Sequence, residues 1–228
     1  MNLLGPQDKR AKEPGDRKEI VLARRRTLER GLGESLLSAL HEEISTTTLL
    51  DVGCGEGYYT GHLQKSLACE AWGVDISSSA VDHAARRWPR VRWVAANGDR
   101  RLPFADGAFD VILSNTGPKN AVEFRRLLTS TGRLFVVTSA PDDLQEFRAA
   151  VLGQAIDVDR TPRIRELFLG PFTLASQRDV RHQATLDHDA LVDLVAGTYR
   201  AARHRERAAL DRITSLAVTL SWRIHAFR

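Results

Sequence analysis

The middle of the chain alternates between short apolar runs and stretches in which apolar residues recur at helical spacing. The pattern predicts strands at residues 48–52, 71–75, 91–95, 109–113 and 134–137, and helices at residues 58–67, 78–87 and 121–128. The runs are apolar at nearly every position, so we expect these strands to be buried on both faces. Strands of this kind belong to a parallel sheet that is covered by helices on both sides. The chain is therefore predicted to have an α/β fold.

The two ends have other patterns. Residues 5–18 are rich in glycine, proline and charges, which predicts an irregular leader. Apolar residues between positions 19 and 40 recur at helical spacing around two glycines, which predicts two short helices. Beyond the core we predict a strand at 180–186, a helix at 187–196, an Arg-rich helix at 201–213 and a last strand at 218–226. Polar residues alternate with apolar ones in that last strand, so one of its faces is expected to be wetter.

We divide the chain into a basic leader with a small helical cap, residues 1–44, and a single α/β domain, residues 45–228. Candidate chemistry is concentrated where the first core strand ends. Gly53, Gly55 and Gly57 follow that strand and lead into a helix. Such a turn permits close approach of a ligand to the backbone and to the amino end of the helix. Asp75 ends the next strand, 22 residues after Gly53. An acid at about this spacing binds ribose hydroxyls in nucleotide-binding folds.

Residues 51–57, Asp-Val-Gly-Cys-Gly-Glu-Gly, together with residues 101–110 and the turn at 132–134, resemble the class I S-adenosylmethionine-dependent methyltransferases. The resemblance implies a Rossmann-like fold with a mostly parallel seven-stranded sheet and S-adenosyl-L-methionine as cofactor. It also implies that Asp51 meets the amino group of the cofactor and that Asp75 meets its ribose. Many members carry an acid where this chain has Gly98, so Asn97 or Asp99 is expected to substitute for it.

The cofactor-binding residues expected from this resemblance are Asp51, Gly53, Gly55, Gly57, Tyr58, Asp75, Ile76, Asn97, Gly98, Asp99 and Ser114. Tyr58 opens the first core helix, where it can pack on the ligand or in the core. No residue is identified as the catalytic base. The histidines and cysteines lack the number and spacing of metal ligands, so no metal site is predicted.

A narrower resemblance involves both ends of the chain. Asn2-Leu3-Leu4, Pro14-Gly15-Asp16, Tyr58-Tyr59-Thr60 and the closing Ile224-His225 are similar to segments of the bacterial 23S ribosomal RNA guanine-N1 methyltransferases. This implies methylation of a ring nitrogen in ribosomal RNA. Two features depart from the family: no zinc-binding module of four ligands precedes the Asn-Leu-Leu segment, and residues 198–202 replace an aromatic segment. A small-molecule methyltransferase for natural-product formation, or a cofactor-binding protein that uses the pocket for another reaction, remain alternatives.

The net charge of +4 is unevenly distributed. Residues 1–30 carry +4 and residues 196–228 carry +5, whereas the segment between them carries −5. The Arg24-Arg25-Arg26 run lies in the first of these basic ends. Two basic ends around an acidic core are compatible with binding to ribosomal RNA, although charged, solvated chain ends have the same composition.

Two observations on composition limit the class of protein. No apolar run approaches the roughly 20 residues of a membrane-spanning helix, and the first residues do not resemble a signal peptide. Cys54 and Cys69 are the only cysteines, which excludes a disulfide framework. We therefore expect a cytoplasmic protein without a membrane partner.

Overall fold

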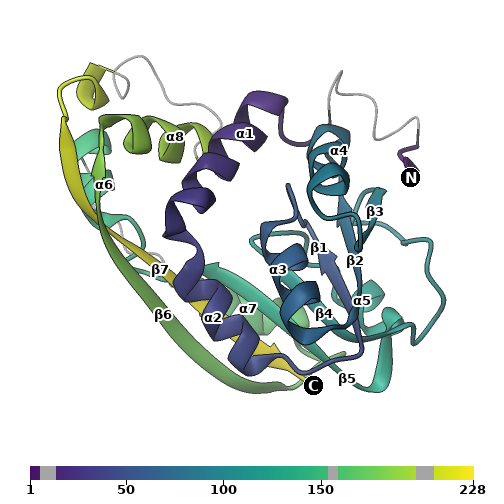
Figure 1. Ribbon diagram of the computed structural model, residues 1–228. Helices are drawn as coiled ribbons and strands as arrows, with labels where there is room; N and C mark the ends of the chain where they lie inside the picture. The colour runs from purple at the N-terminus through teal and green to yellow at the C-terminus, as the bar shows by residue number, and fades with distance from the viewer. Residues whose placement is uncertain (6–13, 154–158, 199–207) are drawn as a thin grey trace.

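The computed structural model describes residues 1–5, 14–153, 159–198 and 208–228. Its centre is a seven-stranded sheet in the order β3-β2-β1-β4-β5-β7-β6. The strands are β1 (Thr48–Val52), β2 (Glu70–Asp75), β3 (Arg92–Ala95), β4 (Phe109–Asn115), β5 (Leu128–Ser139), β6 (Leu174–Asp187) and β7 (Ser215–Phe227). Neighbours pair in parallel from β3 to β5, and β7 runs antiparallel to both β5 and β6 (Figure 1). The predicted α/β fold with a mostly parallel seven-stranded sheet is confirmed.

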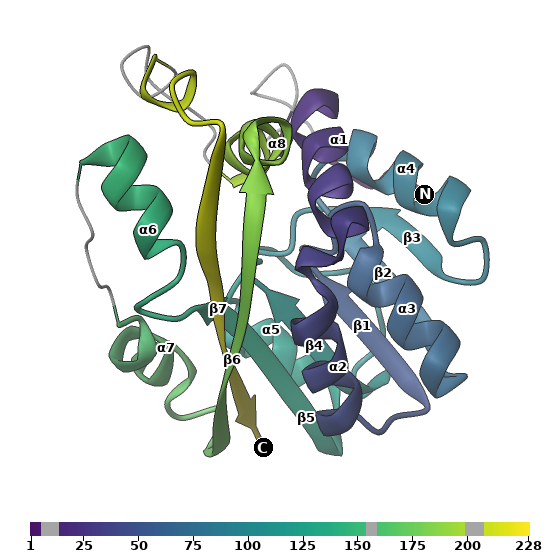
Figure 2. The ribbon, with the colours of Figure 1, turned by 60° about the vertical axis from the view of Figure 1, so that its left-hand side comes forward.

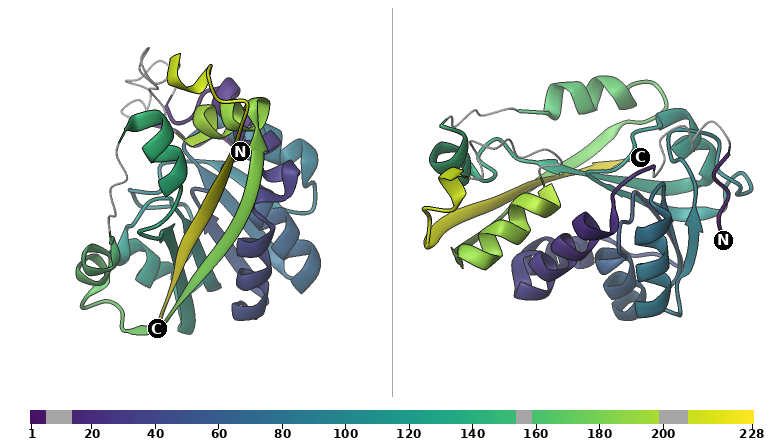
Figure 3. Two further views of the ribbon diagram at one scale, coloured as in Figure 1. Left: turned by 90° about the vertical axis from the view of Figure 1, so that its left-hand side faces the viewer. Right: turned by 90° about the horizontal axis from the view of Figure 1, so that it is seen from above.

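Helices cover both faces of this sheet (Figure 3). They are α1 (Lys18–Thr27), the π-helical turn η2 (Leu28–Leu32), α2 (Glu34–Glu43), α3 (Tyr58–Leu67), α4 (Ser78–Arg87), α5 (Ala121–Leu127), α6 (Gln145–Phe147), the π-helical turn η3 (Arg148–Leu152), α7 (Thr161–Phe168) and α8 (His188–Thr198). Helices α2, α3 and α4 pack on one face, and α5 and α7 on the other. Successive strand residues point to opposite faces, so Leu49 joins the first core and Leu50 the second.

The far ends of β6 and β7 extend beyond the helical layers and form a third core with α6, η3 and α8 (Figure 2). We call this part the C-terminal lobe, residues 140–153, 184–198 and 208–220. Its apolar centre includes Phe147, Leu191 and Leu220. Helix α1 lies beside α8, and Arg26 and Arg30 of the α1–η2 segment both pair with Asp193 on α8, each at 2.6 Å. The cap is therefore joined to the lobe as well as to the sheet.

Several expectations about the tail need correction. The predicted wetter face of the last strand is wrong, because β7 lies between β5 and β6 and its polar residues Ser221 and His225 are fully buried. The exposed residues lie on the edge strand β6 instead. Helices α6 and α7 were not predicted, and most of the Arg-rich helix predicted at 201–213 lies outside the described residues. No helix in the described part of the chain is long and apolar enough to span a bilayer.

Candidate active site

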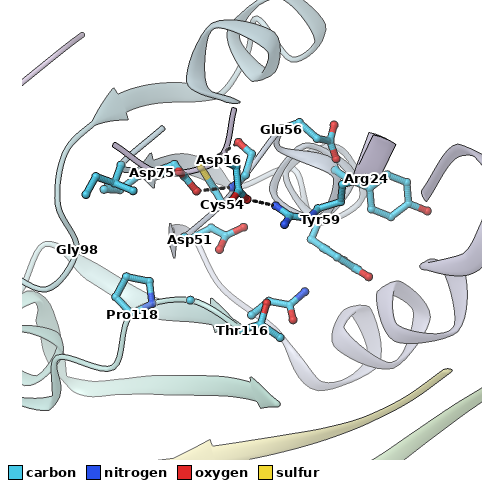
Figure 4. Close-up of a pocket in the computed structure, with 18 of the residues that line it drawn as sticks. Asp16, Arg24, Asp51, Cys54, Glu56, Tyr59, Asp75, Gly98, Thr116 and Pro118 are labelled. Atoms are coloured by element: carbon cyan, nitrogen blue, oxygen red, sulfur yellow. Dashed lines mark hydrogen bonds and ion pairs between the residues drawn. The ribbon is translucent and has the colours of Figure 1, made fainter. Parts of the chain in front are cut away.

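A pocket of about 310 Å³ opens at the carboxyl ends of β1, β2 and β4 (Figure 4). Strand β1 lies between β2 and β4, so the connections leave it in opposite directions and a crevice is left at this point. The residues that line the pocket are Gly15, Asp16, Arg24, Leu28, Asp51, Gly53, Cys54, Gly55, Glu56, Tyr58, Tyr59, Val74, Asp75, Ile76, Asn97, Gly98, Asp99, Asn115, Thr116, Gly117 and Pro118. We call it the first pocket.

The glycine turn brings bare backbone to the wall of the first pocket. Gly53 has a φ of 86°, and a Cβ atom added there would lie 2.8 Å from the Cα of Gly117 in the loop after β4. Its amide donates a hydrogen bond to the carbonyl of Val74 at 2.7 Å. Only glycine combines this backbone conformation with the close approach of two loops.

Asp75 closes β2 at the bottom of the crevice. Its two carboxylate oxygens accept hydrogen bonds from the backbone amides of Gly55, at 2.9 Å, and Ser77, at 2.8 Å. Burial raises the pKa of Asp75, and the two amide hydrogen bonds lower it by a smaller amount. The two amides fix the carboxylate next to the glycine turn, where it can accept hydrogen bonds from a ribose.

Asp51 presents a carboxylate oxygen without a partner. Its Oδ2 accepts a hydrogen bond from the hydroxyl of Thr60 at 2.5 Å, whereas its Oδ1 is buried and has no hydrogen-bond partner. Burial is the largest influence on this group and raises the pKa of Asp51 to about 7. A buried carboxylate in this state is stabilised by a cation that enters the pocket, such as an ammonium group.

Nine of the expected cofactor residues line the first pocket: Asp51, Gly53, Gly55, Tyr58, Asp75, Ile76, Asn97, Gly98 and Asp99. The other two lie outside its lining. Gly57 immediately precedes α3 and has a φ of 81°, and a Cβ atom there would lie 2.4 Å from the ring of Trp93. Ser114 is fully buried, and its hydroxyl donates to the carbonyl of Pro118 at 2.7 Å. Both residues therefore support the backbone around the first pocket without lining it.

The glycine at position 98, where an acid was expected from the resemblance, has a steric reason. A Cβ atom at Gly98 would lie 2.6 Å from a methyl carbon of Val52 and 2.8 Å from the Pro118 ring. An acidic side chain does not fit at this position. Asn97 and Asp99 flank it in the lining, and the side-chain oxygen of Asn97 accepts a hydrogen bond from the Asp99 amide at 3.0 Å.

Sequence reasoning missed the contribution of the N-terminal segment. Asp16 and Arg24 both line the first pocket and form an ion pair with each other (Figure 4). The guanidinium nitrogen and the carboxylate oxygen lie 2.8 Å apart. Arg24 also donates to the carbonyl of Gly197 in the C-terminal lobe at 2.9 Å. The carbonyl of Asp16 accepts from the Ser77 hydroxyl at 2.6 Å. The Pro14-Gly15-Asp16 turn belongs to the segments that resemble the rRNA methyltransferases, and nothing in its spacing indicates that it reaches a pocket about 60 residues further along the chain.

The arginine run of α1 is already engaged. Arg24 pairs with Asp16, Arg25 with Glu29 at 2.9 Å, and Arg26 with Asp193. These side chains therefore hold the cap in place rather than presenting free cations to phosphate groups. The four arginines at positions 200–207 of the basic C-terminal segment lie outside the described residues.

A second pocket of about 500 Å³ adjoins the first, between the sheet and the C-terminal lobe. The two pockets share the side chains of Arg24, Leu28, Tyr59, Asn115 and Thr116. The rest of the second pocket is lined by Thr27, Leu32, Lys119, Thr138, Ser139, Asp143, Leu144, Arg160, Leu194, Gly197, Leu220 and Trp222. Tyr59 is hydrogen-bonded to Asn115 in the shared wall, and burial raises the pKa of its phenol. The arrangement gives two adjoining chambers for two ligands.

Residues 49–135 match the model of a methyltransferase domain family. This part of the chain is a methyltransferase domain. It is of the class I, S-adenosylmethionine-dependent type, and it resembles the 23S ribosomal RNA guanine-N1 methyltransferases. A 23S rRNA (guanine(748)-N(1))-methyltransferase of Streptomyces fradiae is 34% identical over 149 residues, which are 65% of this chain and 53% of that protein.

Other similar proteins have different names. A malonyl-acyl-carrier-protein O-methyltransferase of Legionella pneumophila is 27% identical over 135 residues, 54% of this chain and 47% of that protein. The solved structure of the cyclase SpnF has a TM-score of 0.59 at 19% identity and covers 85% of this chain and 80% of its own, a likeness that shows the fold alone. The chain spans about half the length of the curated relatives it matches first.

S-Adenosylmethionine is the cofactor of this domain type, and the first pocket has groups that suit each part of it. The unpartnered oxygen of Asp51 suits the ammonium group of the cofactor, and Asp75 suits the ribose hydroxyls. Asn97 and Asp99 supply hydrogen-bonding groups that suit the edge of the adenine. When bound, the cofactor supplies a methyl group on a sulfonium that a nucleophile can displace.

Proposed function

We propose that this protein methylates a ring nitrogen of ribosomal RNA, guanine N1. The observation that carries the proposal is the wall that the two pockets share, made of Tyr59, Asn115 and Thr116 together with Arg24 and Leu28. Because the two pockets have these lining residues in common, they are adjacent, and a nucleophile in the second pocket can approach a methyl donor in the first. The names of the rRNA methyltransferases that the chain resembles support guanine N1 as the acceptor.

The second pocket has the size and chemistry for a single extruded base. Enzymes that modify a base take it out of the stack and hold it between aromatic and apolar side chains, with hydrogen bonds to its edge. Trp222 and Tyr59 supply aromatic rings here, and Leu144 and Leu194 supply apolar surface. Asn115, Ser139 and Asp143 supply hydrogen-bonding groups.

Three cationic side chains lie beside the second pocket. Arg160 belongs both to its lining and to an adjoining surface pocket that also includes Lys119 and Arg163. None of the three forms an ion pair with another described residue. Phosphate contacts of this kind position a nucleic acid without reading its sequence. Lys119, Arg160 and Arg163 can therefore contact RNA phosphates next to the second pocket, whereas the arginines of α1 are already paired with carboxylates.

The contribution of the chain to the reaction is alignment and shielding. Methyl transfer is an in-line displacement, so the acceptor atom must lie opposite the leaving sulfur, and fixed geometry can contribute several kcal/mol to such a step. The Arg24 contacts to Asp16 and Gly197 hold α1 over both chambers. Helix α1 therefore covers part of the lining that the two pockets share and shields that part from bulk water.

A small-molecule methyltransferase is the second candidate. The pairing of Arg24, Arg25 and Arg26 with carboxylates favours it, because the described part of the basic N-terminal segment then offers few cations to an RNA backbone. In that case the second pocket would bind the whole acceptor rather than one base of a polymer.

The test is methyl transfer from radiolabelled S-adenosylmethionine to 23S rRNA and, in parallel, to a small-molecule extract. We expect label in the RNA and 1-methylguanosine after nuclease digestion and mass spectrometry. Asp75→Ala serves as the cofactor-site control. Its labelling should fall in proportion to its loss of affinity for the cofactor. Label confined to the extract would refute the RNA proposal and favour the second candidate.

A further inference from the structure

Among the described residues, Asp143 is the one carboxylate that lines the second pocket, and none of these lining residues is a histidine. It follows the end of β5 and precedes α6, and 8% of its surface is exposed. Its Oδ1 accepts a hydrogen bond from the backbone amide of Ser221 on β7 at 2.9 Å, and its side chain is also hydrogen-bonded to Ser139. These contacts from two strands fix the carboxylate in the pocket wall.

The charges near Asp143 come from two other segments. A guanidinium nitrogen of Arg148 on η3 lies 3.9 Å from Oδ2, and Arg160 is near enough to lower the pKa of the carboxyl. Burial is the larger effect, and the net result is a raised pKa. An acid in such surroundings holds a proton more readily than a solvated carboxylate does.

Guanine N1 carries a proton in the neutral base, so its lone pair is not available for attack until that proton leaves. We propose that Asp143 accepts the N1 proton of the guanine. This inference rests on the proposed function. The N1–H bond breaks and the proton passes to a carboxylate oxygen of Asp143, while the N1 electron pair forms the bond to the methyl carbon. The carbon–sulfur bond breaks, and its electron pair remains on sulfur.

The remaining polar groups of the pocket suit other tasks. Negative charge spreads to O6 as N1 loses its proton, and the Arg160 guanidinium in the same lining can donate a hydrogen bond to that oxygen. Tyr59 is hydrogen-bonded to Asn115, and its raised pKa keeps it protonated. Lys119 donates to the carbonyl of Gly117 at 2.9 Å. Asp143 is thus the proton acceptor that this lining offers.

The test compares Asp143→Asn with Asp142→Asn in the full chain. The Asp143→Asn side chain retains an oxygen that accepts the Ser221 amide, so the fold is preserved. Asp142 provides the matched control, because it is the adjacent carboxylate, pairs with Arg181 at 2.7 Å and does not line the second pocket. Binding of S-adenosylhomocysteine and of the rRNA fragment is measured by calorimetry alongside single-turnover methylation from pH 6 to pH 9.

We expect Asp143→Asn to bind both ligands as the wild type does and to lose about 100-fold or more in methylation rate, the usual effect of removing a general base. Its residual rate should rise about tenfold per pH unit, because guanine N1 must then ionise unaided. The wild-type rate should stop rising at a lower pH than the rate of Asp143→Asn does, because Asp143 is then fully ionised. Asp142→Asn should follow the wild type.

Two results would overturn the inference while leaving rRNA methylation intact. One is an Asp143→Asn rate equal to that of the wild type, and the other is a product methylated at a guanine atom that carries no proton. If wild-type protein and Asp142→Asn both fail to label RNA, the proposed function itself is wrong and the inference fails with it.

Discussion

At the scale of single residues, burial is the largest influence on two neighbouring carboxylates of the first pocket. Asp51 and Asp75 are both raised in pKa by burial, and the charge of Asp75 further raises the pKa of Asp51. Because the folded state then holds the proton of Asp51 more tightly than the unfolded chain does, this group lowers the free energy of unfolding as pH rises from about 4 to about 7. A cation that enters the first pocket offsets this loss of stability, because it stabilises the ionised carboxylate.

The raised pKa of Asp51 predicts a pH-dependent cofactor affinity. We expect the ammonium group of the cofactor to bind the ionised form of this carboxylate, which is about a tenth of the population one unit below a pKa of about 7. We expect S-adenosylhomocysteine to bind about tenfold more tightly at pH 8 than at pH 6, with release of a proton. Titration calorimetry in buffers of different ionisation enthalpy measures both effects.

Two variants separate this prediction from a general pH effect on the protein. Asp51→Asn keeps an acceptor for the Thr60 hydroxyl but cannot ionise, so its weaker affinity should be independent of pH. Asp82→Asn removes an exposed carboxylate on α4 and should behave as the wild type does. A pH dependence that persists in Asp51→Asn would assign the proton to another group.

At the scale of elements, local patterns predicted the first half of the chain well. Strand β1 and helices α3 and α4 have the predicted bounds, because a short apolar run and an amphipathic repeat are properties of neighbouring residues. Helix α7 also has local features typical of a helix, namely Pro162 in its first turn and the four-residue spacing of Ile164 and Phe168. The first half of β6 is largely polar, and its strand structure depends on pairing with β7.

The part of the first pocket formed by the glycine turn after β1 and by the end of β2 could be predicted from the sequence. The glycine turn and Asp75 are local, and they line the first pocket as expected. Asp16 and Arg24 reach the pocket through the path of the cap, and Asp143 reaches the second pocket through the fold of the C-terminal lobe. Such tertiary placements leave no periodic pattern in the sequence.

The contact between α1 and α8 yields a prediction at the same scale. Buried Asp193 accepts three hydrogen bonds from Arg26 and one from Arg30. Asp193→Ala removes a charged acceptor shared by two partners, so we expect a loss of about 1–3 kcal/mol in the free energy of unfolding. Urea denaturation measures it.

The same variant should weaken cofactor binding slightly, because α1 carries Arg24 into the first pocket. Asp189→Ala, an exposed carboxylate one turn earlier on α8, is the control and should cost less than about 1 kcal/mol, the contribution of an acid in the first turn of a helix. Equal stability of the two variants would show that the paired arginines do not hold the cap to the lobe.

At the scale of the whole molecule, the net charge is a poor guide to where a polyanion binds. The described arginines of the basic N-terminal end are largely paired within the fold, whereas Lys119, Arg160 and Arg163 gather beside the second pocket in the acidic middle of the sequence. The arrangement of charges in space, rather than their order along the chain, defines the expected RNA-binding surface.

This surface predicts a change in salt dependence. The double variant Lys119→Gln/Arg163→Gln should weaken binding to an rRNA fragment and reduce the slope of log affinity against log salt by about 1 to 2, with cofactor affinity unchanged. Arg86→Gln, on the exposed side of α4, is the control and should leave the slope as it is. An unaltered slope in the double variant would place the RNA elsewhere on the protein.

The shared wall between the chambers also bears on how such proteins diversify. The first pocket is built from residues 15–118, and the second draws many of its distinctive residues from positions 138–222. Mutations in the later half of the chain can therefore reshape the acceptor chamber while the donor chamber stays intact. A lineage with this layout can exchange one substrate for another without passing through an ancestor that has lost its cofactor.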